Sequence, residues 1–268
     1  MTASIRATAA ICARDFRIWS SYRMRFFSTL FAAAFGVTLF YYVSRLVSSP
    51  AVGSADDYFG FVVVGTATLE VLTATLTAPV GTLRSELVVG TFERMVVSAF
   101  GPVPAIVSLL VFPLLLGLVV GAVTITTAAV VFGLDLQWAT VPLAIPAALL
   151  GAVSFAPFGL LMAAAVLVFK QTNAGAAFVI SGLSLVAGLY FPVSLLPDWI
   201  QWASHVQPLT PAVDLMRHLL LGTPMSSGTP LGAVAKLVGF AAVLLPVATV
   251  VLRASLQRSR RNGTITEY

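Results

Sequence analysis

Residues 104–132 read PAIVSLLVFPLLLGLVVGAVTITTAAVVF, a run without a single charged side chain. A helix needs about 20 largely apolar residues to cross a hydrocarbon layer about 30 Å thick, so this stretch is long enough to span a membrane. The whole composition agrees, because 59% of the residues are hydrophobic and only 9% are charged, against roughly 25% charged in soluble domains. The chain is therefore predicted to be an integral membrane protein.

Further apolar runs lie on both sides of this stretch. Backbone groups in lipid must find hydrogen bonds within the protein, and these runs lack the alternation of strands, so helices are expected. The predicted fold is all-α, with a six-helix transmembrane domain over residues 26–252. We expect its helices near residues 26–47, 58–83, 104–132, 139–169, 174–192 and 231–252.

The basic residues fall almost entirely on one side of the predicted helices. Of the 15 Lys and Arg residues, only Arg45, Arg217 and Lys236 fall on the other side. Because cytoplasmic loops are enriched in Lys and Arg, both termini are predicted to be cytoplasmic, in a multi-pass protein of the plasma (cytoplasmic) membrane. The net charge of +5 then reflects topology and contact with membrane lipid, and no nucleic-acid partner is expected. RNA binding by the basic cytoplasmic tail, residues 253–268, is the alternative.

The N-terminal residues 1–25 have the pattern of an amphipathic helix. At 100° per residue one face is apolar and the other collects Arg side chains, which is typical of a helix lying on a membrane surface. The alternative is a frayed leader that serves only topology. The apolar face consists of Ile5, Ala9, Cys12, Phe16 and Trp19.

Two segments outside the transmembrane helices have distinctive patterns. Residues 84–100 predict a short amphipathic helix at the cytoplasmic interface, with Glu86, Gly90, Glu93 and Arg94 on its polar stripe. This stripe is either a docking surface for a soluble partner or merely a solvated face. Residues 193–222 predict two short helices on the outer side, too short to span. They form either a hairpin that enters the outer leaflet or an aromatic anchor at the headgroups. The residues of interest there are Tyr190, Phe191, Pro192, Pro197, Trp199 and Trp202.

Glu70 is an acidic residue deep inside a predicted span. Thr66, Glu70, Thr73 and Thr77 recur on one helix face. A charged residue at the bilayer centre costs at least about 2.5 kcal/mol unless it is paired, protonated or facing water. The strip therefore lines a pathway or subunit interface, or it has a hydrogen-bonded structural role, and Lys236 is the obvious basic partner.

Two motifs resemble those of ABC-2 type transporter permeases. The run Gly90-Thr91-Phe92-Glu93-Arg94 is similar to the cytoplasmic signature Gly-Thr-Leu-Glu-x-Leu, with Phe92 in place of the usual Leu. The second is a Pro-bounded element on the outer side. It combines Phe191-Pro192, Leu196-Pro197, Pro208-Leu209-Thr210 and an arginine, Arg217, ahead of leucines and Gly222.

This resemblance implies the membrane subunit of an ATP-binding-cassette exporter. It implies a second permease subunit, forming a homodimer, and two copies of a separate cytoplasmic ABC ATPase. ATP and Mg would be bound by that partner, with no cofactor in this chain. Phe92, Met95 and Val96 would insert into the ATPase or the membrane surface. The ATPase-coupling residues would be Glu86, Gly90, Thr91, Phe92, Glu93, Arg94 and Met95.

No enzymatic activity is expected of the chain itself. Its two lysines, Lys170 and Lys236, follow Phe169 and Ala235, so the chain contains no Gly-Lys-Ser/Thr phosphate loop. We predict no catalytic and no metal site. The few acids and the Phe-rich aromatic content favour an amphipathic, lipid-like or drug-like substrate, with a glycan as the alternative. An ion-coupled secondary transporter that uses Glu70 is the rival function.

Overall fold

The computed structural model describes residues 2–46, 53–92, 94, 100–169, 173–226 and 228–261. The secondary-structure elements in these ranges are all helices, which confirms the predicted all-α fold of an integral membrane protein. The helices, in chain order, are α1 (Thr2–Ser21), α2 (Arg23–Leu46), α3 (Ala55–Val89), α5 (Pro102–Ser108), α6 (Val111–Phe132), α7 (Val141–Phe169), α8 (Asn173–Val186), the 3-10 turn η1 (Val193–Leu195), α9 (Asp198–His205), α10 (Leu209–Leu221) and α11 (Pro230–Arg261).

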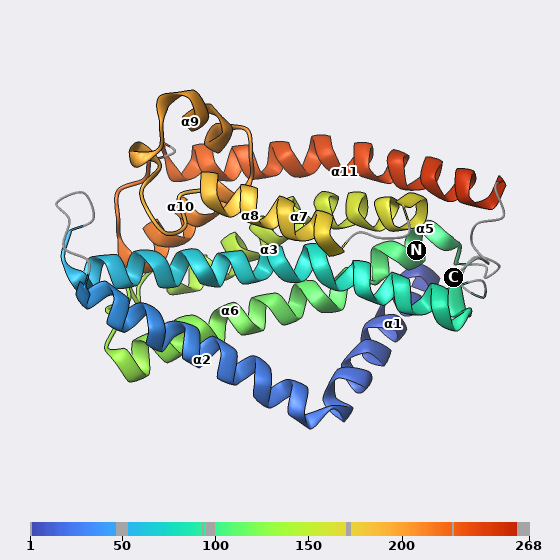
Figure 1. The fold of residues 1–268 in the computed structure, drawn as a ribbon, viewed down its shortest axis with the longest axis horizontal. Coiled ribbons are helices and arrows are strands. Elements are labelled where there is room, and N and C mark those ends of the chain that lie inside the picture. The colour runs from blue at the N-terminus through green and yellow to red at the C-terminus, as the bar shows by residue number, and fades with distance from the viewer. Residues whose placement is uncertain are drawn as a thin grey trace.

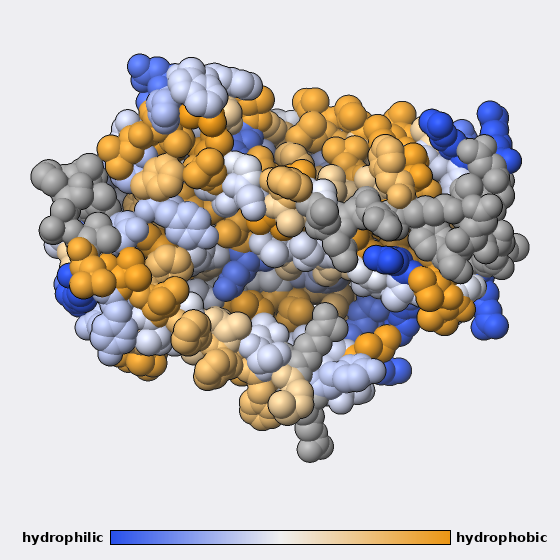
Figure 2. Space-filling model, in the orientation of Figure 1, coloured by the Kyte–Doolittle hydropathy of each residue, from blue (hydrophilic) through white to orange (hydrophobic). Residues whose placement is uncertain are grey.

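The long helices run along the longest axis of the molecule (Figure 1). Helix α1 and the last turns of α11 lie toward one end, and α9 and α10 lie at the opposite end. Figure 2 shows hydrophobic side chains over the middle of this face and hydrophilic ones gathered toward the two ends. This distribution is expected if the long axis of the molecule, along which the helices run, crosses the bilayer.

Five helical segments of the described chain are long and apolar enough to cross a membrane. They are Phe27–Leu46, Ala55–Val89, Pro102–Phe132, Val141–Phe169 and Pro230–Ser259. Each corresponds to a span predicted from the sequence.

The remaining predicted span, residues 174–192, is a shorter helix. Helix α8 has 14 residues, which gives about 21 Å at 1.5 Å per residue, less than the hydrocarbon thickness. The chain turns after α8 because Gly188 adopts a left-handed φ of 72° and Pro192 follows it. It continues into η1 and α9 (Figure 1).

Helix α3 is the centre of the fold. It begins at a capping box, in which the Ser54 hydroxyl accepts from the Asp57 amide and the Asp57 carboxylate accepts from the Ser54 amide. In the apolar stretch of α3, 67% of the residues are buried inside the protein, against 17% in that of α2. With 35 residues it is about 52 Å long, so it extends beyond a hydrocarbon layer of about 30 Å.

Helix α6 approaches α3 closely through two glycines one turn apart. A Cβ added to Gly117 would lie 3.0 Å from the Cα of Val71, and one added to Gly121 would lie 2.9 Å from the carbonyl oxygen of Ala67. Small residues four apart allow this contact between helix backbones in membranes. The contact places Thr124, on the next turn of α6, beside α3.

Candidate functional site

The predicted amphipathic helix 84–100 is divided between two elements. Residues 84–89 are the last turns of α3, which ends at Gly90 with a left-handed φ of 75°. The expected stripe from Glu86 to Arg94 therefore does not lie on one continuous helix, because Gly90 changes the chain direction. Thr91, Phe92 and Arg94 are helical beyond this break, whereas Glu93 and Met95 lie outside the described residues.

Glu86 joins the end of α3 to α1. Its carboxylate lies 2.7 Å from Nη1 of Arg14 and also accepts a hydrogen bond from the Thr91 hydroxyl. Arg14 contacts Asp15 as well, at 2.8 Å. Partial burial lowers the pKa of Arg14, but the carboxylates of Asp15 and Glu86 outweigh it, and the net effect is a raised pKa. Arg14 therefore stays protonated at neutral pH.

Three further contacts hold α1 against α5 and α6. The hydroxyls of Thr8 and Ser108 lie 2.9 Å apart. The rings of Phe16 and Trp19 both meet Phe112 edge-on, with centroids 6.4 Å apart in each case. We call the surface formed by α1, residues 84–92, Arg94 and α5 the coupling end.

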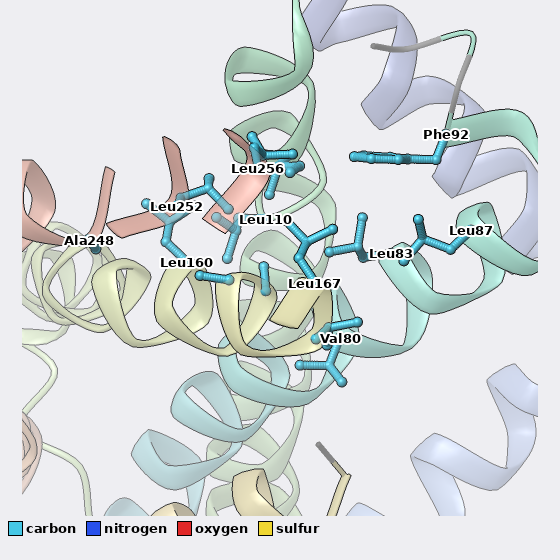
Figure 3. Packing of buried hydrophobic residues seen from close by; sticks show 14 residues of the cluster. Val80, Leu83, Leu87, Phe92, Leu110, Leu160, Leu167, Ala248, Leu252 and Leu256 are labelled. Carbon is cyan, nitrogen blue, oxygen red and sulfur yellow. The ribbon is translucent and has the colours of Figure 1, made fainter. Parts of the chain in front are cut away.

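Phe92 lies inside the protein, which corrects the expectation that it inserts into a partner or the membrane. Its side chain is fully buried. It belongs to a cluster that joins the ends of α3, α7 and α11 (Figure 3). The neighbouring Val88 and Val89 are 61% and 73% exposed, and Arg94 is exposed too. The cluster includes Leu83, Leu87, Leu110, Leu160, Leu167, Leu252 and Leu256.

Glu70 faces α6. Its carboxylate oxygens lie 3.1 and 3.2 Å from the hydroxyl of Thr124. The hydroxyls of Thr66 and Thr77 donate to carbonyls of α3 itself, those of Val63 and Thr73. Lys236, the basic partner considered from the sequence, instead lines a cavity between α7 and α11. Among the described residues, the polar contact that this strip makes with another helix is the one between Glu70 and Thr124.

Arg217 is a central residue whose partners the sequence did not reveal. It is 4% exposed in α10. Its guanidinium donates to the carbonyl oxygens of Phe61, Gly188 and Leu189 at 2.8 to 3.0 Å. Gly188 and Leu189 follow the end of α8, where carbonyls lack helical partners. Arg217 therefore satisfies buried backbone carbonyls at a break that would otherwise be costly. The only signals in the sequence were its place in an apolar segment and in the second motif.

The predicted outer-side residues divide between packing and exposure. Tyr190 stacks on Phe40 of α2 with ring centroids 5.9 Å apart. Trp199 and Trp202 on α9 are 75% and 64% exposed. Helix α10, by contrast, buries most of its residues, among them Leu209, Val213 and Arg217, so it packs within the helix bundle. Phe191 and Pro192 are partly buried, and Pro197 is exposed.

Three contacts described above involve α3: Arg14 with Glu86, Thr124 with Glu70, and Arg217 with Phe61. Helix α3 connects them along the long axis of the molecule. Glu86 lies near one end of α3, Glu70 near its middle, and Phe61 toward the other end. The fold and this arrangement define a multi-pass, α-helical membrane protein.

Comparison with known proteins identifies the family. A family model described as ABC-2 type transporter matches residues 7–221, most of the chain. The chain belongs to the ABC-2 type transporter family, and it is a membrane transport component.

Two proteins named nodulation protein J are similar to parts of the chain. That of Rhizobium leguminosarum bv. trifolii is 32% identical over 94 residues, covering 33% of this chain and 34% of the relative. That of Rhizobium meliloti (strain 1021) is 29% identical over 126 residues, 45% of each. The similarity therefore spans less than half the length of either relative.

Proposed function

We propose that the chain is the permease subunit of an ABC exporter, driven by a separate cytoplasmic ATPase. Families of this type normally act with an ATP-binding subunit. The observation on which the proposal rests is the ion pair of Arg14 with Glu86 at the end of α3. Through this ion pair, a force applied to α1 at the coupling end reaches the central helix α3.

Transmission follows from the continuity of α3. Closure of the ATPase dimer pushes on the exposed surface around Val88, Val89 and Arg94. Because Glu86, Glu70 and Phe61 belong to one helix, displacement of its end changes the contacts with α6 and α10 together. Packed helices switch between discrete arrangements rather than deforming smoothly.

The permease acts as a homodimer, with α2 in the contact between the two copies. One face of α2 has large apolar side chains, each at least half exposed, at spacings of three and four residues. Phe31 and Phe35 stack on this face with ring centroids 6.3 Å apart. A partner helix would bury these rings, and aromatic contacts add to association. The face consists of Phe27, Phe31, Phe35, Leu39 and Tyr42.

Both termini are cytoplasmic in this arrangement. The described basic residues of α1, of the end of α3 and of the end of α11 share the end of the molecule that has the coupling surface (Figure 1). Arg45, paired with Asp56 at 2.7 Å, lies at the opposite end of α2 and α3. The positive-inside rule supports this orientation.

The substrate we propose is amphipathic, lipid-like or drug-like, or a glycan, moved out of the cytoplasm. The few acidic residues of the chain, 10 Asp and Glu in 268, and its 18 Phe side chains support an apolar cargo.

Two measurements test the proposal. Tagged chain purified in mild detergent should retain an ATPase with a phosphate-binding loop, and native mass spectrometry should show two copies of each subunit. In a Cys12→Ser background, Phe35→Cys should cross-link two copies, whereas Val130→Cys, 78% exposed on α6, should not. A chain that purifies without an ATPase, and that alone conducts ions down a gradient in vesicles, contradicts the proposal and favours the Glu70 secondary transporter.

A further inference from the structure

A groove separates α6 from α7, because both helices pack on α3 and contact each other far less. Its volume is about 700 Å³. Small residues leave this space, since Ala67 of α3, Gly121 and Ala122 of α6, and Ala148 and Gly151 of α7 all line it. The described residues along its walls include no Asp, Glu, Lys, Arg or His, so the groove is uncharged.

One hydrogen-bond donor is open at the groove. The polar side chains in its lining are those of Thr68, Thr126 and Trp138. The two threonine hydroxyls donate to carbonyl oxygens of their own helices, at 2.9 and 2.7 Å. Trp138 is 73% exposed, and its side chain makes no hydrogen bond within the described part of the chain. Because an indole N–H only donates, Trp138 can bind an oxygen atom of a ligand.

The dimensions of the groove fit a hydrocarbon chain. Its lining residues run from Leu115 to Val130 on α6 and from Val141 to Phe155 on α7, which is about 21 Å at 1.5 Å per residue. The volume divided by this length gives a mean cross-section of about 33 Å². A helix with its side chains is about 10–12 Å across and needs roughly 80–110 Å². A carbon chain is only about 4 Å wide, so the groove accommodates an acyl chain and is too narrow for a second helix.

The groove opens onto the lipid-facing surface of the protein. Val130 and Ile145 line it and are both exposed, in two of the segments that are long and apolar enough to cross a membrane. Trp138 lies in the connection between these segments, beside Gln137, whose amide donates to the Leu220 carbonyl near the end of α10. Tryptophan favours the headgroup level of a bilayer, so we expect this end of the groove at that level.

We propose that this groove binds one acyl chain of a bilayer phospholipid, taken from the leaflet at the α10 end. The chain lies between α6 and α7 over the small residues of the floor. The indole of Trp138 donates a hydrogen bond to an ester or phosphate oxygen of the same lipid. The surrounding membrane supplies this lipid, and its binding requires neither the ATPase nor the exported cargo.

Contact with the walls, rather than removal from water, favours the bound chain. Lipid tails are as apolar as the side chains of the groove, so transfer between the two gives little hydrophobic free energy. An empty groove, however, leaves its lining atoms without neighbours on one side, and those dispersion contacts are lost. A longer acyl chain restores more of them and should therefore bind more firmly.

The test measures lipid retention by the full chain purified in detergent. The protein is incubated with lysophosphatidylcholine that has either a palmitoyl or an octanoyl chain, and the bound lipid is counted by native mass spectrometry. The unchanged protein should retain one palmitoyl lipid per chain and lose the octanoyl lipid. Ala122→Phe places a ring in the groove and should abolish retention of the palmitoyl lipid. Trp138→Phe keeps an aromatic ring without the donor and should reduce retention about five-fold, the expectation for one hydrogen bond.

Matched variants control for general effects of these substitutions. Ala242→Phe enlarges an exposed alanine of α11, outside the groove. Trp199→Phe changes a tryptophan of α9 that is as exposed as Trp138 and does not line the groove. Both should retain the palmitoyl lipid as the unchanged protein does. Size-exclusion chromatography establishes for each variant that the protein is folded.

Several outcomes would overturn the proposal. Equal retention of the two lipids by the unchanged chain would show that the length of the groove is not used. Undiminished retention in Ala122→Phe would place the lipid elsewhere, and undiminished retention in Trp138→Phe would remove the headgroup contact. Disulfide cross-linking of two copies through Val130→Cys, in a Cys12→Ser background, would show that a second chain covers the groove.

Discussion

Arg217 lies over the ring of Phe61, 3.3 Å from its centroid, and also donates to the carbonyl oxygen of the same residue at 2.8 and 3.0 Å. One side chain of α10 thus contacts both the ring and the backbone of α3. The same guanidinium reaches Gly188 and Leu189, so three segments distant in sequence meet at one group. A planar fork of five N–H donors suits this task.

Replacement of Arg217 by Lys should destabilise the protein strongly. A single ammonium cannot reach all three carbonyls in this geometry, and each buried polar group left without a partner costs about 1–3 kcal/mol. The apparent melting temperature in detergent, followed by fluorescence-detected size exclusion, should fall clearly. Arg253→Lys, on an exposed position of α11, should leave it unchanged. Equal melting temperatures for the two variants would contradict this account of Arg217.

Gly65→Ala should weaken the same contact from the α3 side. The added Cβ would lie 2.8 Å from Nη2 of Arg217 and 2.9 Å from the carbonyl oxygen of Leu189, closer than real Cβ contacts. Overpacking of this kind costs about 1–3 kcal/mol. Gly36→Ala on α2 is the matched control, since its Cβ would meet nothing within 4 Å. Thermal unfolding of both variants decides the matter, and similar stabilities would argue against a close approach at Gly65.

Phe92→Ala should reduce stability rather than only partner binding. Removal of a buried phenylalanine typically costs about 3–5 kcal/mol, and Phe92 is fully buried. Val89→Ala, on a side chain 73% exposed, should hardly change stability and should instead lower affinity for the ATPase. Unfolding midpoints and pull-down of the ATPase separate the two effects. A Phe92→Ala protein with normal stability and lost ATPase binding would restore the insertion role.

Exchange of the charges of Arg14 and Glu86 should show whether their ion pair transmits force. Arg14→Glu or Glu86→Arg alone places like charges together and should uncouple ATP hydrolysis from transport. The double exchange re-creates an opposite pair and should recover much of the coupling. The ratio of substrate-stimulated to basal ATPase activity is the measurement. If the single variants kept a normal ratio, the Arg14–Glu86 ion pair would not transmit force between α1 and α3.

Glu70→Gln separates a structural from an ionic role. An amide can still hydrogen-bond the Thr124 hydroxyl, so assembly and nucleotide-driven activity should persist. Thr124→Val removes that hydrogen bond and leaves Glu70 without it, which should cost about 1–3 kcal/mol. Stability and transport are assayed for both. Loss of a proton-driven flux in Glu70→Gln alone would indicate a coupling carboxylate.

The positions of the long helices could be predicted because apolar length is a local property of the sequence. Residues 104–132 and 139–169 needed no knowledge of their neighbours, and the helices found there begin and end within a few residues of the prediction, apart from the division between α5 and α6. Glu70 was recognised as unusual for the same reason.

The partners of individual residues could not be predicted, because they depend on where the chain turns. The apolar pattern runs on through Leu189, yet α8 ends at Val186, and the carbonyls held by Arg217 become available only through that break. Likewise, the resemblance to ABC-2 permeases implied that Phe92 inserts into a partner or the membrane surface. The left-handed Gly90 redirects the chain, and Phe92 turns inward instead.

The contacts of Arg217 with Gly188 and Leu189 can form only after α10 has been synthesised, because Arg217 follows α8 in the chain. Helix α8 is synthesised well before the arginine that completes its end, and with only 14 residues it is a poor insertion signal by itself. We therefore expect α8 to reach its final position only after α10 has been translated. In a chain that ends just before Arg217, the carbonyls of Gly188 and Leu189 would lack this donor, so we expect α8 to be weakly anchored until α10 has been made.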